Sequence, residues 1–100
     1  MPVYHVSRAT NRDLILQEGI CPHNIHGRTQ EFDWLSGKDH VYFWDNLEDA
    51  KQWKNGYHGL TSDIWEAEPP TVCEPDPNLG DTRGAYRTPV ILKPIAIVQE

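Results

Sequence analysis

Glycine and proline residues interrupt this chain so often that only short helices and strands can form between them. Its 100 residues include seven glycines and eight prolines. Glycine permits backbone conformations that end regular elements, and proline removes a backbone donor that helices and central strands need. The interruptions are densest from Pro69 to Gly84, so we expect this stretch to be rich in turns. The chain is therefore expected to consist of short elements.

Two helices are predicted between these interruptions. Thr10 stands three residues before Asp13 in a spacing like that of a capping box, and Gly19 offers a helix stop. A second helix is expected after Asn46, which serves as its N-cap, and it ends at the Asn55-Gly56 pair. Its apolar face is formed by Leu47, Ala50 and Trp53.

Runs of β-branched and aromatic residues predict the strands. They cover Val3–Ser7, His40–Trp44, Ser62–Glu68, Ala85–Thr88 and Val90–Val98. We expect a short extended segment at Ile20–Pro22 and an irregular loop at His23–Lys38. Pro89 and Pro94 restrict the last two strands to sheet edges or bulges. This order of elements predicts one α+β domain with two short helices that spans residues 1–100.

The charge of the chain is negative and unevenly distributed. A net charge of -6 argues against sequence-independent nucleic-acid binding, which needs clustered Lys and Arg. Between Ser62 and Asp81 the chain has acidic residues and no Lys or Arg. These acids are Asp63, Glu66, Glu68, Glu74, Asp76 and Asp81. They form either a solubilising surface or an acidic face that docks a basic partner protein.

No export signal or membrane span is expected. An apolar leader segment does not follow Met1, and no apolar run approaches the roughly 18 residues of a spanning helix. The two cysteines, Cys21 and Cys73, are too few for a disulfide framework. We therefore expect free thiols and a cytoplasmic location.

Two segments in the first half of the chain carry a family pattern. One is Val3-Tyr4-His5-Val6-Ser7, and the other is Gly37-Lys38-Asp39-His40-Val41-Tyr42-Phe43-Trp44-Asp45. They resemble the His-bearing first strand and the Gly-x-x-Ile-Tyr-Phe-x-Asp segment of the ADP-ribosyltransferase superfamily, in its diphtheria-toxin-like and polymerase-like branch. The link Glu18-Gly19-Ile20-Cys21-Pro22 is similar to the family's connection between them. The resemblance implies a small split β-sheet domain that binds NAD or a related nucleotide.

The resemblance also implies roles for particular residues. His5 would hydrogen-bond a ribose hydroxyl of NAD, with Ser7 beside it, and Tyr42 would stack on the nicotinamide ring. Their side chains are then expected to line one concave site on neighbouring strands. The alternative interpretations stay open: His5 is a hydrogen-bonded strand histidine, and Tyr42 is a core aromatic.

The family's late-strand Glu has no counterpart here. A carboxylate at that place stabilises the positive charge that develops on the ribose as nicotinamide leaves. The matching strand, Ala85–Thr88, contains no acid. The chain is then a degenerate binder, or uses a shifted acid such as Glu68, or uses Arg87 for phosphate contacts. Whether it is an enzyme stays undecided.

A function of another class competes with ADP-ribose transfer to a macromolecule. A non-catalytic interaction protein would use a degenerate version of the fold and an acidic, Trp-rich surface to bind and perturb a partner protein. We expect no nucleic-acid partner, except a nucleic acid that the protein modifies as its substrate. Cys21, His23 and His26 are close in sequence, but structural zinc sites need a second pair of ligands, so no metal site is expected.

Overall fold

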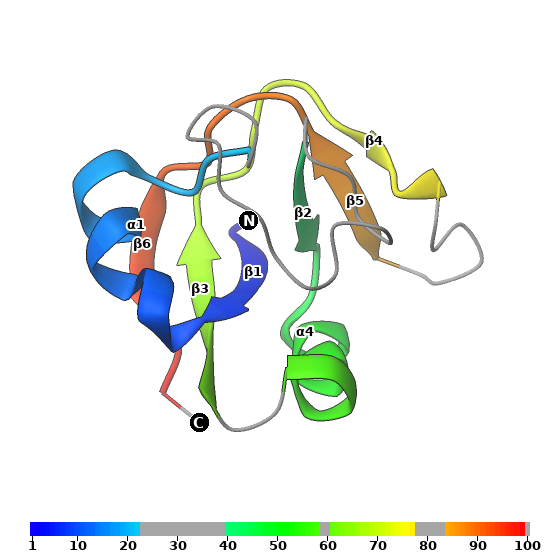
Figure 1. Ribbon diagram of the computed structural model, residues 1–100. Helices are drawn as coiled ribbons and strands as arrows, with labels where there is room; N and C mark the ends of the chain where they lie inside the picture. Colours follow the sequence, from blue (N-terminus) through cyan, green and yellow to red (C-terminus); the bar gives the residue numbers. More distant parts are fainter. Residues whose placement is uncertain (23–39, 59–60, 78–83, 100) are drawn as a thin grey trace.

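The computed structural model describes residues 1–22, 40–58, 61–77 and 84–99, and within them it confirms the predicted α+β class. Six strands form one antiparallel sheet in the order β4-β5-β2-β1-β3-β6 (Figure 1). The strands are β1 (Val3–Arg8), β2 (Val41–Trp44), β3 (Ser62–Ala67), β4 (Glu74–Pro75), β5 (Ala85–Thr88) and β6 (Pro94–Ile97). The two described α-helices are α1 (Arg12–Glu18) and α4 (Leu47–Trp53).

The central strand β1 is held very differently by its two neighbours. It pairs with β3 along its whole length, from Val3 opposite Ala67 to Arg8 opposite Ser62. Its pairing with β2 is registered at a single position, Tyr4 opposite Trp44. The sheet therefore consists of two three-stranded halves, β1-β3-β6 and β2-β5-β4, which meet at this position. This arrangement agrees with the split sheet expected from the sequence.

The first helix begins later than predicted. A 3-10 turn (Ala9–Asn11) follows β1, and α1 starts at Arg12 without a side-chain cap. The expectation that Thr10 caps this helix is therefore wrong, because the chain needs one tight turn to leave the sheet. The predicted stop is confirmed. Gly19 has a φ of 85° and donates its backbone N–H to the Ile15 carbonyl at 2.8 Å.

The second helix begins as predicted. The side chain of Asn46 accepts a hydrogen bond from the Asp49 backbone N–H at 2.9 Å, so it caps α4. The α-helix ends at Trp53, and a π turn (Lys54–His58) follows it through Asn55 and Gly56. The predicted stop at this pair is therefore wrong, because Gly56 does not take the positive φ that ends α1 at Gly19. No described helix has the length and apolarity that crossing a membrane requires.

The strands after α4 differ from the prediction in two places. A two-residue strand, β4, lies inside the stretch expected to be rich in turns, and it pairs with β5. The last strand begins at Pro94 rather than Val90. It is an edge strand whose register with β3 shifts between Glu66 and Ala67, which confirms the prediction for the strand that carries Pro94. The same prediction is wrong for β5, which lies between β4 and β2, because this strand ends at Thr88, before Pro89. Ile20 forms an isolated bridge with Leu92, as its extended character suggested.

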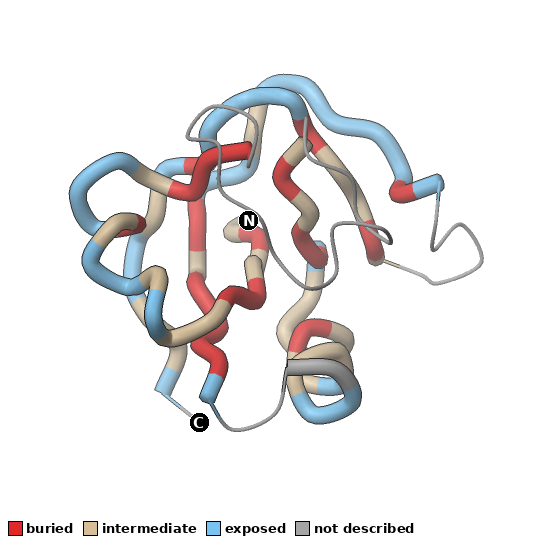
Figure 2. The backbone as a smooth tube through the Cα atoms, viewed as in Figure 1, coloured by how far each residue is buried: buried red, intermediate tan, exposed pale blue. Residues whose placement is uncertain are grey.

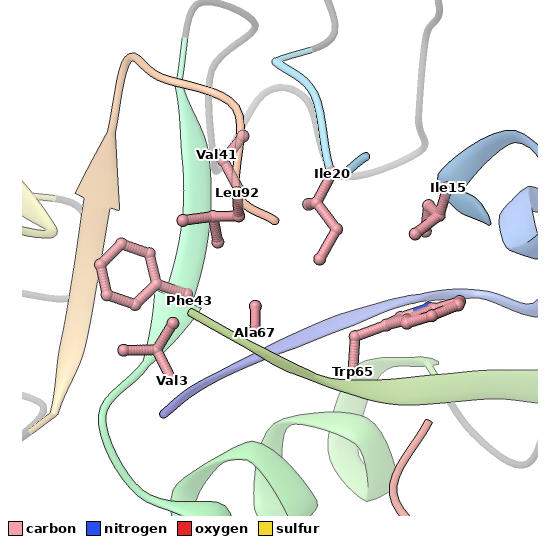
Figure 3. Close-up of a cluster of buried hydrophobic side chains, with 8 residues drawn as sticks. All are labelled: Val3, Ile15, Ile20, Val41, Phe43, Trp65, Ala67 and Leu92. Atoms are coloured by element: carbon pink, nitrogen blue, oxygen red, sulfur yellow. The ribbon is translucent and has the colours of Figure 1, made fainter. Parts of the chain in front are cut away.

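Two clusters of apolar side chains lie on the two faces of the sheet. The α1-side cluster combines strand residues with Ile15, Ile20 and Leu92 (Figure 3). Its strand members are Val3, Val41, Phe43, Trp65 and Ala67. The α4-side cluster contains Val6, Trp44, Ala50, Ile64 and Ala85. Figure 2 shows that buried residues concentrate in β1, β2 and β3, whereas α1 is mostly exposed.

The contribution of the Asn46 cap to the stability of the fold can be tested by substitution. Asn46→Ala removes the acceptor for the Asp49 N–H, so we expect a loss of about 1 kcal/mol in the free energy of unfolding. The melting temperature should fall by about 4–8 °C, measured by circular dichroism. The matched control is Asn55→Ala, an exposed asparagine in the π turn after α4, which should change stability by less than about 0.5 kcal/mol. Equal losses in the two variants would show that the cap contributes nothing.

The two cysteines should react at different rates. Cys21 is buried, with its Sγ near the carbonyl of Glu18 at 3.4 Å, whereas Cys73 is exposed, and both are free thiols. A thiol reagent added to the native protein without reductant should modify one thiol rapidly, and a second only after unfolding. Rapid modification of both in the native state would contradict the burial of Cys21.

Candidate functional site

The narrow contact between the two sheet halves is where the sequence placed its candidate site. The Nδ1 atom of His5 on β1 lies 2.6 Å from the backbone carbonyl of Tyr42 on β2. A carbonyl only accepts hydrogen bonds, so Nδ1 carries the proton and donates. His5 therefore supplements the single registered pair, Tyr4 opposite Trp44, in joining the halves. The expectation that β1 and β2 are neighbouring strands is confirmed.

The side chains of His5 and Tyr42 do not share a face. On β1, Tyr4 and Val6 pack with the α4-side cluster, so His5 between them points to the α1 side. On β2, Val41 and Phe43 belong to the α1-side cluster, so Tyr42 between them points to the α4 side. The expectation that the two side chains line one concave site is therefore wrong. His5 reaches the backbone of Tyr42 and not its ring.

Tyr42 and Arg87, both predicted to bind the cofactor, are brought together. They are direct cross-strand partners in the pairing of β2 with β5, so their side chains leave the sheet on the same face. The Arg87 side chain hydrogen-bonds the side chain of Tyr42. It also forms an ion pair with Glu74 on β4, in which Nε donates to Oε1 at 2.5 Å. An aromatic ring, a cation and a carboxylate thus adjoin on one side of the β2-β5-β4 half.

The environment of this cluster favours the charged form of Arg87. The hydrogen bond with Tyr42 raises the pKa of Arg87 above its ordinary value, and the bond and charge of Glu74 act in the same direction against partial desolvation. The ring of His40 lies 6.4 Å from the ring of Tyr42 at a tilt of 58°. The side chain of Arg87 is 25% exposed and that of Glu74 is 54% exposed, so solvent reaches the ion pair. The guanidinium is a permanent, accessible positive charge.

Ser7, the other residue of the His-x-Ser pattern, is buried on the opposite face. Its Oγ has no hydrogen-bond partner, and neither does Nε1 of Trp65, whose backbone pairs with that of His5. Both residues are 1% exposed. Buried polar groups in native proteins normally have partners, so each of these two atoms is an exception. No feature of the sequence indicates that Nε1 of Trp65 lacks a partner.

Glu68, the candidate catalytic acid, lies in the other half of the sheet. It follows the end of β3, where its backbone N–H donates to the Lys93 carbonyl at 3.0 Å. Its carboxylate lies 3.4 Å from Lys93 Nζ, and its side chain is 53% exposed. Strands β1 and β2 separate it from Arg87 on β5. The structure does not bring Glu68 together with Tyr42 and Arg87.

In the fold, basic side chains offset part of the negative charge of the acidic stretch between Ser62 and Asp81. Bases from distant parts of the chain pair with three of its members: Arg12 with Asp63, Lys93 with Glu68 and Arg87 with Glu74. Asp63 is also buried. Asp81 lies outside the described residues. A continuous acidic face over these described residues is therefore not what the fold presents.

The tryptophans are also placed differently from the expectation of a Trp-rich surface. Trp44 and Trp65 are core residues at 7% and 1% exposure. Trp53 is partly buried and packs against Trp44, with ring centroids 5.9 Å apart. The expectation is wrong for these three, because the sheet is too small to bury its faces without them. Trp34 lies outside the described residues.

Glu74 is the residue of this cluster that sequence reasoning did not single out. It stands in a proline-rich stretch, and a strand of two residues leaves no periodic pattern in a sequence. The described residues contain no group of three or more His, Cys, Asp or Glu that could hold a metal ion. His23 and His26 lie outside them.

The unpaired hydroxyl of Ser7 can be tested by substitution. Ser7→Ala removes a buried polar atom that has no partner, so the free energy of unfolding should stay unchanged or rise by up to about 1 kcal/mol. The control is Thr88→Val. Thr88 is fully buried and its Oγ1 bonds the Val72 carbonyl at 2.6 Å, so its loss should cost about 1 kcal/mol. Urea unfolding of both variants measures this, and equal destabilisation would reveal a partner for Ser7.

No protein-family model matches the chain, and neither the curated proteins nor the solved structures gave a match.

Proposed function

We propose that this domain binds a nucleotide, NAD or a related dinucleotide, through Tyr42 and Arg87. The observation that carries the proposal is the direct cross-strand pairing of these two residues on one face of the sheet. They are 45 residues apart in the sequence, and the sequence pattern predicts a cofactor-binding role for each of them.

The chemistry of the pair suits such a ligand. A guanidinium presents several N–H donors in a planar fork that matches phosphate oxygens, and its charge does not titrate near neutral pH. The tyrosine ring offers a flat face for a base or a nicotinamide ring. Together they provide one contact for a phosphate and one for an aromatic ring. His5 would serve this site by positioning the Tyr42 backbone, and Ser7 is not part of it.

The proposal is for binding and not for ADP-ribose transfer. Transfer needs a carboxylate beside the ribose to stabilise positive charge. Among the described residues, the carboxylate that adjoins Tyr42 and Arg87 is Glu74, and it is engaged in an ion pair. Glu68 is paired with Lys93 in the other half of the sheet. We place the protein in the cytoplasm, where free thiols such as Cys21 and Cys73 stay reduced.

A protein-interaction function is the alternative, and the described residues favour it less. It relied on exposed tryptophans and on a continuous acidic face, whereas the described tryptophans pack into or against the core and three acids have basic partners. Binding of a partner protein in the absence of any nucleotide binding would revive it.

Thermal unfolding with and without NAD tests the proposal. A ligand that binds only the native state stabilises it, and a dissociation constant of about 0.1 mM gives about 1.4 kcal/mol at about 1 mM NAD. The melting temperature should then rise by several degrees. Arg87→Gln should remove most of this rise because the phosphate contact is lost.

The matched control is Lys93→Gln, which also removes one positive charge and one exposed ion pair with a glutamate. It lies in the other half of the sheet, so the NAD-induced rise should be that of the unaltered protein. Absence of any rise at millimolar NAD, or an equal rise in Arg87→Gln, would refute the proposed site.

A further inference from the structure

The side chain of Glu74 already occupies the place that a ligand phosphate would take at Arg87. Both Nε and a terminal nitrogen of Arg87 contact the same carboxylate oxygen, each at 2.5 Å. Carboxylates and phosphates are recognised by a guanidinium through the same kind of charge-assisted, two-point hydrogen bonding. One guanidinium edge does not hold both at full strength. Glu74 and an anionic ligand therefore compete for it.

The strand that carries Glu74 is held in place by contacts on both sides. Before it, the Val72 carbonyl accepts a hydrogen bond from Thr88 Oγ1 at 2.6 Å. After it, the Asp76 backbone N–H donates to the Ala85 carbonyl at 3.0 Å. The side chain of Glu74 is 54% exposed. Releasing Arg87 therefore requires rotation of one solvent-accessible side chain and leaves the backbone of β4 where it is.

We propose that Glu74 is an internal competitor for the Arg87 guanidinium. Its carboxylate balances the charge of Arg87 until a phosphate-bearing ligand displaces it. This inference rests on the proposed function, because it concerns the same Arg87 site. Its consequence is selectivity by ligand charge. A pyrophosphate carries more negative charge than a single carboxylate and displaces Glu74, whereas a weak monoanion such as acetate does not. Glu74 thus sets both the affinity of the site and the class of anion that it accepts.

Titration calorimetry with inorganic pyrophosphate tests the competition without the rest of a nucleotide. Glu74→Gln removes the competing charge and should tighten pyrophosphate binding by about fivefold, the upper end for an exposed ion pair. The matched control is Glu68→Gln, which changes the net charge equally and breaks the pair with Lys93. It should alter pyrophosphate affinity by less than about twofold.

A second readout follows the guanidinium itself. In the unaltered protein, pyrophosphate should shift the Arg87 Nε–H resonance in a nitrogen-proton NMR spectrum toward its position in the pyrophosphate-bound Glu74→Gln variant. This measurement needs no variant of Arg87, so it stands even if Arg87→Gln fails to fold.

The outcomes separate the inference from the proposed function. Equal pyrophosphate affinity in the unaltered protein and in Glu74→Gln overturns the competition, while an NAD-induced thermal shift would still support nucleotide binding. Tighter pyrophosphate binding in Glu74→Gln without NAD binding in either protein supports the competition and refutes NAD as the ligand. Equal tightening in Glu68→Gln shows a non-specific effect of net charge and overturns the inference.

Discussion

The unequal pairing of the central strand β1 is the constraint on which the rest of the structure depends. Full-length pairing with β3 fixes one half of the sheet, whereas the other half is attached at Tyr4 opposite Trp44 and by the bond from His5 to the Tyr42 carbonyl. The orientation of β2 decides where Tyr42 points and which residue of β5 faces it. The candidate site therefore depends on a junction with a single registered strand pair, which the His5 side chain supplements and which both apolar clusters span.

Ion pairs between distant segments decide the electrostatic character of the molecule. In the sequence, acids accumulate after Ser62 without a nearby base. In the fold, α1 supplies Arg12, β5 supplies Arg87, and the segment before β6 supplies Lys93. The pair of Arg12 with the buried carboxylate of Asp63 compensates a charge that is costly to leave alone away from water. The pair at Arg87 is solvent-accessible and contributes little to stability, so the proposed ligand would displace Glu74 at little cost to the fold.

The residues expected to bind one cofactor separate into two pairs on opposite faces of the sheet. Ser7 and His5 point to the α1 side, and Tyr42 and Arg87 to the α4 side. Strand alternation causes this separation, because successive side chains along a strand point to opposite faces of the sheet. The sequence pattern identified these residues as candidates, but it did not indicate the register of β1 against β2. One registered pair was enough to assign the faces.

Local chemistry in the sequence determined the α+β class, the cap of α4 at Asn46, the stop of α1 at Gly19 and the edge position of the proline-bearing last strand. Each of these depends on residues within a few positions of one another, where capping, glycine conformation and proline geometry act. Only the tertiary structure decided the pairing of β4 with β5, the contact of Glu74 with Arg87 and the opposite faces of His5 and Tyr42. These depend on strand register between distant segments, which is set by the packing of both faces at once and leaves no local trace.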